Sequence, residues 1–593
     1  MRRLLPALAA VVLLANPAGA TTPNAGRGTD PYLTTGALGY DVLHEDVSLT
    51  YDARTHGLSA ASATVTAAAT TALTSLTLDL GQPLTVLSVT VNGAPARFSH
   101  VSGKLGVTPA SALPSRRQFR VAVRYKGTPG YHADTSLRGP VGWERTRGGA
   151  VTYTEPDGTH EWVPIKDVLY DKATWTVRLT TPRGLLGAST GRYVGLTQTS
   201  TTNTTTWDQS APVTPYQQMV AIDRFSTSTA SVDGIRSFVA VTPVRANPAV
   251  PPPSVATMQH DTAQALTWLT ARLGPFPYSD TGALVVSGGD SAMETAGRPT
   301  YSDDSDYDFS DHVVVHELAH EWFGGRLTAQ NVADVWIHEA FATWLERYWQ
   351  SQQPGGEPFA AHLRRNYLLD GFDPHRAGQF ASVSVQAPTN AYRLESTVYY
   401  RGAMAVEALR QQIGAAAFGT VLKALGQQPA GHAFTTSQVV AIAQQASGQD
   451  LSSWRATWLA STGAQQPPAH ATAQQTADEL AQLIGFYVYD ASPDVLTPSD
   501  LANEIGDVKT AYSTNLPLEL VSVGPTSSAT VGTTAVTRAQ LDVPAGLYGA
   551  AVHACITLPT DINSQGDPDA WFNEHVPLSA TPDPDTVTLS GCP

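Results

Sequence analysis

The sequence of 593 residues has only two cysteines, few charged residues and no long hydrophobic run. Two cysteines cannot build a disulfide-dense scaffold or a structural zinc site made of cysteines. The chain has 36 lysines and arginines and 51 aspartates and glutamates. The resulting net charge of −15 disfavours binding to nucleic acid through bulk charge. No segment has about 18 consecutive apolar residues, so the sequence predicts no membrane span.

The first 20 residues are typical of a signal peptide. Arg2 and Arg3 precede a short apolar run, and a small-residue cleavage site ends at Ala20. We therefore expect cleavage near Ala20 and a secreted, extracellular protein. The alternative for this segment is a buried N-terminal helix.

The rest of the chain divides by pattern and composition. Apolar residues make up 42% of the sequence, and its length suggests about three or four domains. Alternating apolar positions such as Val47, Leu49 and Tyr51 predict strands in the N-terminal part, and apolar residues at helical spacing follow a Pro-rich connection. The predicted segments are a β domain at 31–230, a mainly helical domain at 254–463, a linker at 464–475 and a mixed accessory domain at 476–593.

The accessory segment contains both cysteines of the chain. In an exported protein we expect Cys555 and Cys592 to form one disulfide. The sequence shows no catalytic group in this segment and identifies no partner for it.

The residues with the clearest chemistry are in the pattern His316-Glu-Leu-Ala-His320. Residues four apart lie on one face of a helix, so both imidazoles can reach one metal ion. Glu317 lies beside them and can act as the general base on a metal-bound water. The alternative is a buried helix with two hydrogen-bonded histidines.

A second predicted helix, at about 334–352, carries Glu339 in its first turns. Two antiparallel helices can bring Glu339 to the third ligand position, which leaves one position of a zinc site open for water. Glu346 and Asp334 are candidates for orienting the histidines. His338 adjoins Glu339 on the helix and is not expected to reach the same ion, because neighbouring side chains point about 100° apart.

The pattern His-Glu-x-x-His, 18 residues, Glu resembles the M1 family of zinc aminopeptidases, a gluzincin family. The segment from Trp162 to Ala173 and the stretch from Trp207 to Pro212 are similar to family segments. The resemblance covers about residues 38–463, and we expect the chain to lack the large helical C-terminal domain of many members. It implies one Zn²⁺ per chain, held by His316, His320 and Glu339.

The resemblance also implies residues that bind the free amine of a peptide. Ser291-Ala-Met-Glu-Thr295 is similar to the family motif that anchors this amine, which assigns the role to Glu294. Glu155 matches a second family position that meets the amine. For each carboxylate the alternative is an ordinary loop or turn residue.

Tyr399-Tyr-Arg-Gly402 resembles the family motif that supplies a hydroxyl to the oxyanion, which assigns that role to Tyr399 rather than Tyr400. An aromatic residue packed in a helical core is the alternative. The sequence departs from the family at several positions, including His338, Ser291, Thr295 and Arg401, which affects the shape of the first substrate pocket.

Together these patterns predict a multidomain α+β protein. An N-terminal antiparallel β domain precedes a mainly helical, thermolysin-like catalytic domain and a small accessory domain of mixed helices and strands. The expected function is hydrolysis of N-terminal residues from peptides with a free N-terminus, by zinc-activated water with Glu317 as general base. The alternatives are a zinc endopeptidase and a non-catalytic peptide-binding or adhesion module.

Overall fold

The computed structural model describes residues 28–560, with gaps at 135, 138, 244–252, 290, 304–309, 357, 373–382, 390–393, 463–476, 479, 482, 486–487, 489–496, 513–520, 532–533 and 545–550. The predicted signal peptide at 1–20 lies outside the described residues. Cys555 is buried in the C-terminal sheet, but Cys592 also lies outside them, so the disulfide stays a prediction.

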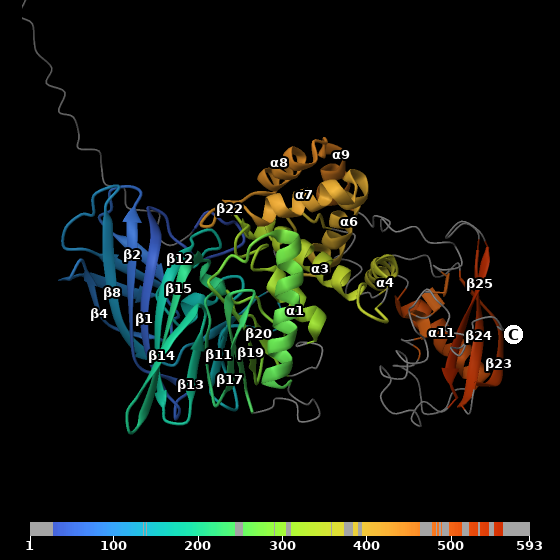
Figure 1. The fold of residues 1–593 in the computed structure, drawn as a ribbon, viewed down its shortest axis with the longest axis horizontal. Helices are drawn as coiled ribbons and strands as arrows, with labels where there is room; N and C mark the ends of the chain where they lie inside the picture. Colours follow the sequence, from blue (N-terminus) through green and yellow to red (C-terminus); the bar gives the residue numbers. More distant parts are fainter. Residues whose placement is uncertain are drawn as a thin grey trace, which may run out of the picture.

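An eight-stranded sheet dominates the N-terminal region (Figure 1). Its interior positions alternate as the sequence predicts, with Trp175, Val177 and Leu179 facing the core. The strand order across the sheet is β14 (Arg192–Gln198), β15 (Thr202–Val213), β12 (Ala173–Pro182), β1 (Tyr40–Asp52), β2 (Gly57–Ala69), β8 (Gln118–Gly127), β4 (Thr85–Val91) and β5 (Ala94–Pro95).

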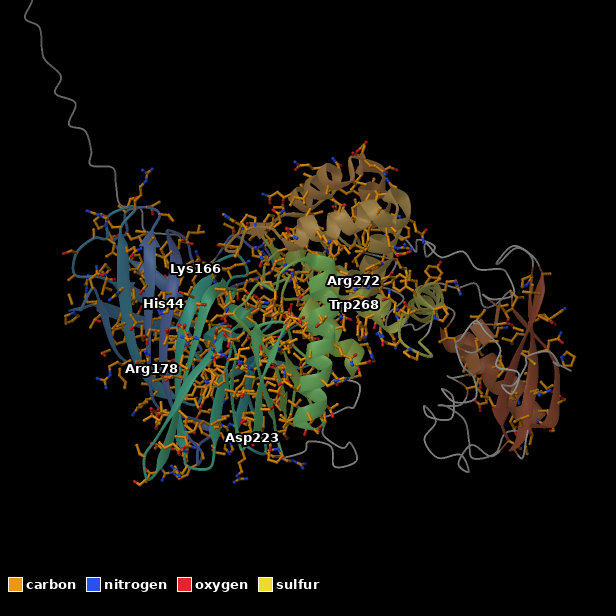
Figure 2. All side chains as sticks on the ribbon, in the orientation of Figure 1. His44, Lys166, Arg178, Asp223, Trp268 and Arg272 are labelled. Carbon is orange, nitrogen blue, oxygen red and sulfur yellow. The ribbon has the colours of Figure 1, made fainter. Side chains whose placement is uncertain are left out.

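The prediction of a purely antiparallel sheet is wrong for one central pair. Strands β1 and β12 run parallel, with Val47 opposite Val177. The side chains of Arg178 and Asp46 form an ion pair of 2.8 Å across this pair, and Figure 2 labels Arg178 on it. Alternation in the sequence reports which face is buried and carries no information on strand direction. The long connection between the two strands allows the parallel pairing.

Two smaller sheets complete the N-terminal region. A three-stranded sheet packs beside the large one, in the order β3 (Leu76–Asp79), β7 (Lys104–Thr108) and β6 (Arg97–Val101). A five-stranded sheet has the order β13 (Leu186–Ser189), β16 (Val220–Asp223), β11 (Ala150–Tyr153), β10 (Pro140–Arg145) and β9 (Tyr131–Ala133).

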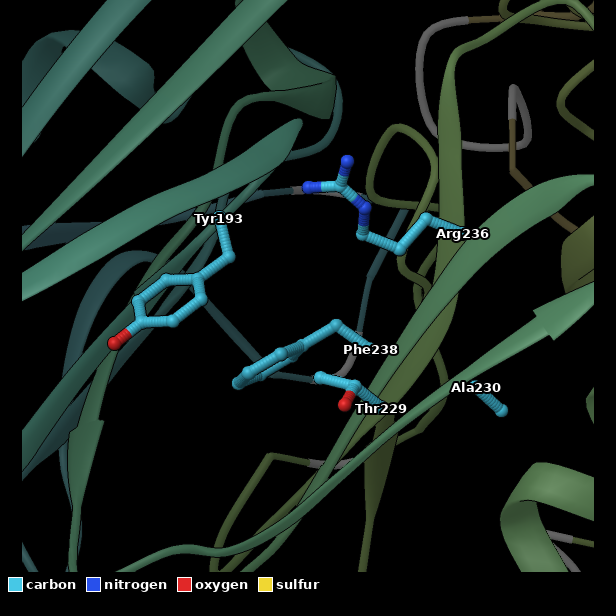
Figure 3. Close-up of a pocket in the computed structure, with 5 residues that line it drawn as sticks. All are labelled: Tyr193, Thr229, Ala230, Arg236 and Phe238. Atoms are coloured by element: carbon cyan, nitrogen blue, oxygen red, sulfur yellow. The ribbon is translucent and has the colours of Figure 1, made fainter.

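A four-stranded sheet joins the N-terminal region to the helical region. Its order is β17 (Ser226–Val232), β18 (Ile235–Val241), β19 (Asp280–Val286) and β20 (Thr300–Ser302). Strand β17 extends past the end of the predicted β domain at 31–230, and β18 lies between that domain and the predicted helical domain at 254–463. A cavity of about 370 Å³ opens beside β17 and β18, and its five lining residues include no metal-binding or acidic side chain (Figure 3): Tyr193, Thr229, Ala230, Arg236 and Phe238.

Helices form most of the region that follows. Helix α1 (Val255–Leu273) packs against the sheet and against α3 (Trp336–Gln350), where Trp268 meets Trp349 edge to face at 5.3 Å. Figure 2 labels Trp268 on α1. The other helices are α2 (Asp311–Ala319), α4 (Phe359–Phe372), α6 (Gly402–Ile413), α7 (Ala415–Gly426), α8 (Thr436–Ser447) and α9 (Ser452–Trp454). A two-stranded pair, β21 (Thr328–Ala329) and β22 (Ala433–Phe434), links the helices.

Short helical turns connect these elements. They are the 3-10 turns η1 (Thr159–Glu161), η2 (Pro215–Gln217) and η4 (Val332–Asp334), and the π-helical turns η6 (Thr397–Arg401) and η7 (Arg455–Ala460).

The C-terminal segment consists of helical turns from residue 477, α11 (Pro498–Tyr512) and a sheet of β23 (Ser522–Val531), β24 (Thr534–Val543) and β25 (Val552–Pro559). Its buried cluster also includes residues of the helical region. Leu363 and Tyr367 of α4 and Met404 of α6 belong to the same buried cluster as Leu480 and Leu541. The tail therefore shares apolar contacts with the helices that precede the predicted linker.

The described part of the chain is thus a mixed α+β protein with a large β-rich N-terminal region, as the sequence predicts. Among the described residues, no helix is both long and apolar enough to cross a membrane.

Candidate active site

The two histidines and the glutamate of the sequence motif meet at the contact between α2 and α3. His316 lies in α2 and His320 directly follows that helix, while Glu339 lies in the first turn of α3. The Glu339 carboxylate oxygen Oε2 is 3.6 Å from His316 Nε2 and 3.5 Å from His320 Nε2. Three candidate ligand atoms from two elements therefore converge on one point.

Each histidine is oriented by a partner on its other ring nitrogen. Nδ1 of His316 lies 2.9 Å from Glu346 Oε2, and Nδ1 of His320 lies 3.0 Å from the carbonyl oxygen of Phe323. A proton on Nδ1 satisfies both contacts and leaves each Nε2 with a lone pair toward Glu339. The other candidate for this role, Asp334, instead accepts hydrogen bonds from Thr436 at the start of α8.

The charges around the cluster suit a dication. Burial opposes ionisation of Glu339, but without a metal the protonated rings of His320 and His316 hold its pKa well below the usual range. A bound dication takes the place of the protons on the two Nε2 atoms. Burial also opposes ionisation of Glu346, whose pKa falls to about 2 through Arg347 and His316. Two imidazoles and one carboxylate are the donor set of a catalytic zinc site with an open position, so these residues fit zinc.

Glu317 is buried next to the cluster. Burial raises its pKa to about 8, the nearby histidines oppose the rise, and Glu294 and Glu339 add to it. A carboxyl with a pKa close to neutral can both accept and return a proton.

Tyr399 faces the same cluster from the turn η6 before α6. Its ring stacks on that of His316 with the centroids 6.3 Å apart and the planes 12° apart. Burial raises the pKa of Tyr399 well above its ordinary value, and Glu339 and Glu155 add to the rise. The side chain therefore keeps its hydroxyl proton. Tyr400 packs against the buried cluster of the C-terminal segment instead.

Glu155 and Glu294 meet beside the cluster, although they lie far apart in the sequence. Their carboxylates and a ring nitrogen of His338 lie within 4.8 Å of one another. Burial raises the pKa of Glu155, and Glu294 raises it further. Burial also raises the pKa of Glu294, while His320 opposes the rise. Oε1 of Glu294 is buried and has no hydrogen-bond partner among the described residues.

Sequence reasoning missed His338 as a member of this group. Its Nε2 accepts a hydrogen bond of 2.8 Å from the backbone N–H of Ala329. Burial lowers its pKa to about 3, so the ring is neutral and does not compensate the two carboxylates. The helix positions separate His338 from the metal cluster, as expected, but only the tertiary structure shows which group it joins.

Two buried basic side chains hold the backbone next to the site. Lys172 lies near the end of the segment 162–173. It donates hydrogen bonds to the carbonyl oxygens of Gly325 at 2.8 Å and Arg326 at 3.2 Å, in the loop that follows His320. Arg401 donates to the carbonyl oxygens of Val383 at 3.0 Å and Ser461 at 2.7 Å. These contacts hold the loop after His320 and the turn that carries Tyr399.

Comparisons with known proteins show similarity to M1 peptidases. Residues 291–458 match the Peptidase family M1 domain. Aminopeptidase N of Streptomyces lividans is 27% identical over 187 residues, which cover 29% of this chain and 22% of that protein. Aminopeptidase N of Lactococcus lactis subsp. lactis is 29% identical over 156 residues, covering 26% and 18%. The chain spans about a fifth of the length of these relatives.

Solved structures match a larger part of the chain. The crystal structure of an M1 zinc metallopeptidase from Deinococcus radiodurans superimposes with a TM-score of 0.65 at 27% identity, covering 74% of this chain and 98% of that chain. A mutant of a two-domain M1 zinc metallopeptidase bound to L-tryptophan has a TM-score of 0.65 at 28% identity, covering 73% and 97%. The domain match, the relatives and the shared fold show a peptidase family M1 domain at residues 291–458 and a similarity to M1 zinc metallopeptidases over about three quarters of the chain.

Proposed function

We propose that this protein is an exported zinc aminopeptidase that removes N-terminal residues from peptides. The observation that carries the proposal is the pair Glu155 and Glu294 beside the cluster of His316, His320 and Glu339. The carboxylate of Glu294 is buried, that of Glu155 is half-buried, and the neighbouring ring of His338 is neutral. Among the described residues, no lysine or arginine forms an ion pair with either carboxylate. The ammonium group of a peptide N-terminus supplies a positive charge there and accounts for specificity toward free amines.

The proposed mechanism assigns one task to each group. His316, His320 and Glu339 hold the zinc, which supplies Lewis-acid chemistry when bound. Glu317 takes a proton from the attacking water and delivers it to the leaving amine. The hydroxyl of Tyr399 donates a hydrogen bond to the oxyanion that forms at the scissile carbonyl. Glu155 and Glu294 bind the ammonium group and fix the position of the first peptide bond.

The proposal also includes the boundaries of the domains and the export of the protein. Residues 254–463 form the thermolysin-like catalytic domain, 31–230 cover it as a β domain, and 476–593 form an accessory domain after the linker. The N-terminal pattern up to Ala20 supports export and cleavage.

A pair of matched peptides tests the proposal. The purified chain should release the first amino acid from a short peptide with a free amine, and it should leave the N-acetylated form of the same peptide nearly intact. Acetylation removes the positive charge that Glu155 and Glu294 bind and adds bulk at that position. Equal cleavage of both peptides, at internal bonds, would instead establish an endopeptidase.

A further inference from the structure

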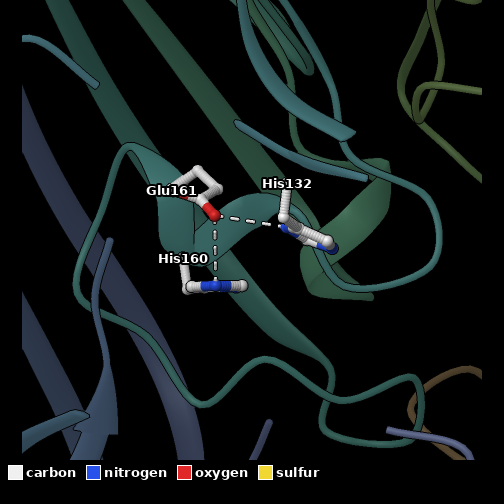
Figure 4. A group of neighbouring side chains, drawn as sticks. All are labelled: His132, His160 and Glu161. Atoms are coloured by element: carbon white, nitrogen blue, oxygen red, sulfur yellow. Dashed lines mark hydrogen bonds and ion pairs between the residues drawn. The ribbon is translucent and has the colours of Figure 1, made fainter. Parts of the chain in front are cut away.

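A second group of potential metal ligands lies in the β-rich region, outside the catalytic cluster (Figure 4). His132 belongs to β9 at the edge of the five-stranded sheet, and His160 and Glu161 belong to the turn η1. One ligand atom of each residue lies within 4.8 Å of the other two. The group has the composition of the catalytic cluster: two histidines and one glutamate.

The distances in the two groups are also similar. Oε1 of Glu161 is 3.2 Å from His132 Nδ1 and 3.6 Å from His160 Nε2, and Figure 4 shows both rings turned toward this oxygen. Two donors bound at about 2.0–2.1 Å to a tetrahedral zinc lie about 3.4 Å apart. The observed separations therefore match those of ligands around one ion.

Both histidines have a carboxylate at the nitrogen that faces away from Glu161. Nδ1 of His160 lies 2.9 Å from Asp167 Oδ2, and Nε2 of His132 lies 3.3 Å from Asp157 Oδ1. The carboxylate of Asp157 is itself held by a hydrogen bond of 3.2 Å from Thr35. Carboxylates in this position fix the ring and its tautomer, as they do around metal-bound histidines.

The Glu161 side chain is packed in place by three glycines. A Cβ at Gly81 would lie 2.7 Å from Glu161 Oε2, and one at Gly130 would lie 3.1 Å from the same atom. A Cβ at Gly142 would lie 2.9 Å from Glu161 Cγ. The His132 side chain is 31% exposed, whereas those of His160 and Glu161 are 12% and 10% exposed, so an ion can enter from solvent to a largely enclosed position.

We propose that His132, His160 and Glu161 form a second metal site, which binds Zn²⁺ with water at the fourth position. The dication balances part of the negative charge of Glu161, Asp157 and Asp167, which lie around the two rings. The bound ion links the edge strand β9 to η1, across a contact between residues 28 positions apart in the sequence (160 − 132 = 28). The site is separate from the catalytic cluster and does not depend on the proposed function.

The zinc content of the full chain and its variants tests the proposal. After dialysis against buffered zinc, the unaltered protein should hold two equivalents by mass spectrometry of the metal. His316→Ala and His160→Ala should each hold one equivalent, and the double variant should hold none. His100→Ala is the matched control, because His100 contacts a backbone carbonyl outside the group and its loss should leave two equivalents.

A more conservative substitution tests the same site without removing a ligand side chain. Asp167→Asn keeps a side-chain oxygen next to His160 but removes the charge, and it should weaken zinc binding at the second site about 10–100-fold. A single equivalent in the unaltered protein that disappears in His316→Ala and persists in His160→Ala would overturn the proposal. The three residues would then form an ion-pair cluster in which His132 and His160 carry protons and bind no metal. Retention of one equivalent in His316→Ala supports the second site whether or not the protein cleaves peptides.

Discussion

At the scale of single residues, the proposal assigns proton transfer to Glu317 and a hydrogen bond to the oxyanion to Tyr399. Glu317 lies next to His316 without joining the ligand set. Glu317→Gln keeps the size of the side chain and removes the basic oxygen. We expect this variant to keep its catalytic zinc and to lose at least about 10²–10⁴-fold in kcat. Metal analysis and steady-state kinetics on the same preparation check both expectations, and a fully active variant would exclude Glu317 as the base.

Tyr399→Phe removes only the hydroxyl from a ring stacked on His316. If the hydroxyl donates to the oxyanion, kcat should fall about 10²–10³-fold, with little change in KM. The control is Tyr400→Phe, which removes the same group from a side chain that packs toward the C-terminal segment. A loss confined to the Tyr400 variant would show that the roles are exchanged. Normal rates in both variants would leave Tyr399 as a packing residue.

At the scale of elements, the close contact between α3 and α6 lies next to Glu339, so we expect it to affect the position of that carboxylate. A Cβ at Gly402 would lie only 2.6 Å from Cβ of Ala340, the residue after Glu339. Gly402→Ala should therefore push the helices apart and lower the free energy of unfolding by about 1–3 kcal/mol. Denaturant unfolding measures this change, and zinc affinity should fall in parallel.

Gly419 in α7 supplies the matched control for this substitution. A Cβ there meets no atom within 4 Å. Gly419→Ala should raise the free energy of unfolding by about 0.5–1 kcal/mol, because alanine favours the helix interior over glycine. Equal effects of the two substitutions would mean that the α3–α6 contact does not limit the site.

The elements also show what sequence reasoning can and cannot reach. The spacing from His316 to His320 is a local property of one helix, so the sequence predicts that both face one point. The meeting of Glu155, Glu294 and His338 depends on how the β-rich region packs on the helices, and no local pattern contains that information. The same reason explains why the parallel pairing of β1 and β12 and the group around His160 were not predicted.

At the scale of the whole molecule, the sequence indicates that the C-terminal segment is separate, because a polar, Pro-rich linker precedes it. The structure instead places Leu363, Tyr367 and Met404 in the core of that segment. Apolar residues on one side of a helix do not reveal which other segment covers them. The composition of a linker therefore marks a boundary along the chain. It does not show that the segments on either side of it fold independently.

Removal of residues 464–593 should expose these three side chains. Burial of each contributes about 1.5–3 kcal/mol, so the shortened chain should lose on the order of 5 kcal/mol of stability. We expect a lower Tm and increased binding of an apolar dye compared with the full chain. An unchanged Tm would show that the two parts fold independently, as the linker composition suggests.

Tyr399 and Tyr400 bring the active site and the core of the C-terminal segment to neighbouring positions on one turn. One tyrosine stacks on His316 and the next packs in the core that the C-terminal segment completes. If release of the tail shifts this turn, a ligand that binds the docked tail more tightly than the released tail also favours the backbone position that presents the Tyr399 hydroxyl. By thermodynamic reciprocity, a peptide analogue bound at the zinc centre changes the affinity of the tail for that ligand by the same factor.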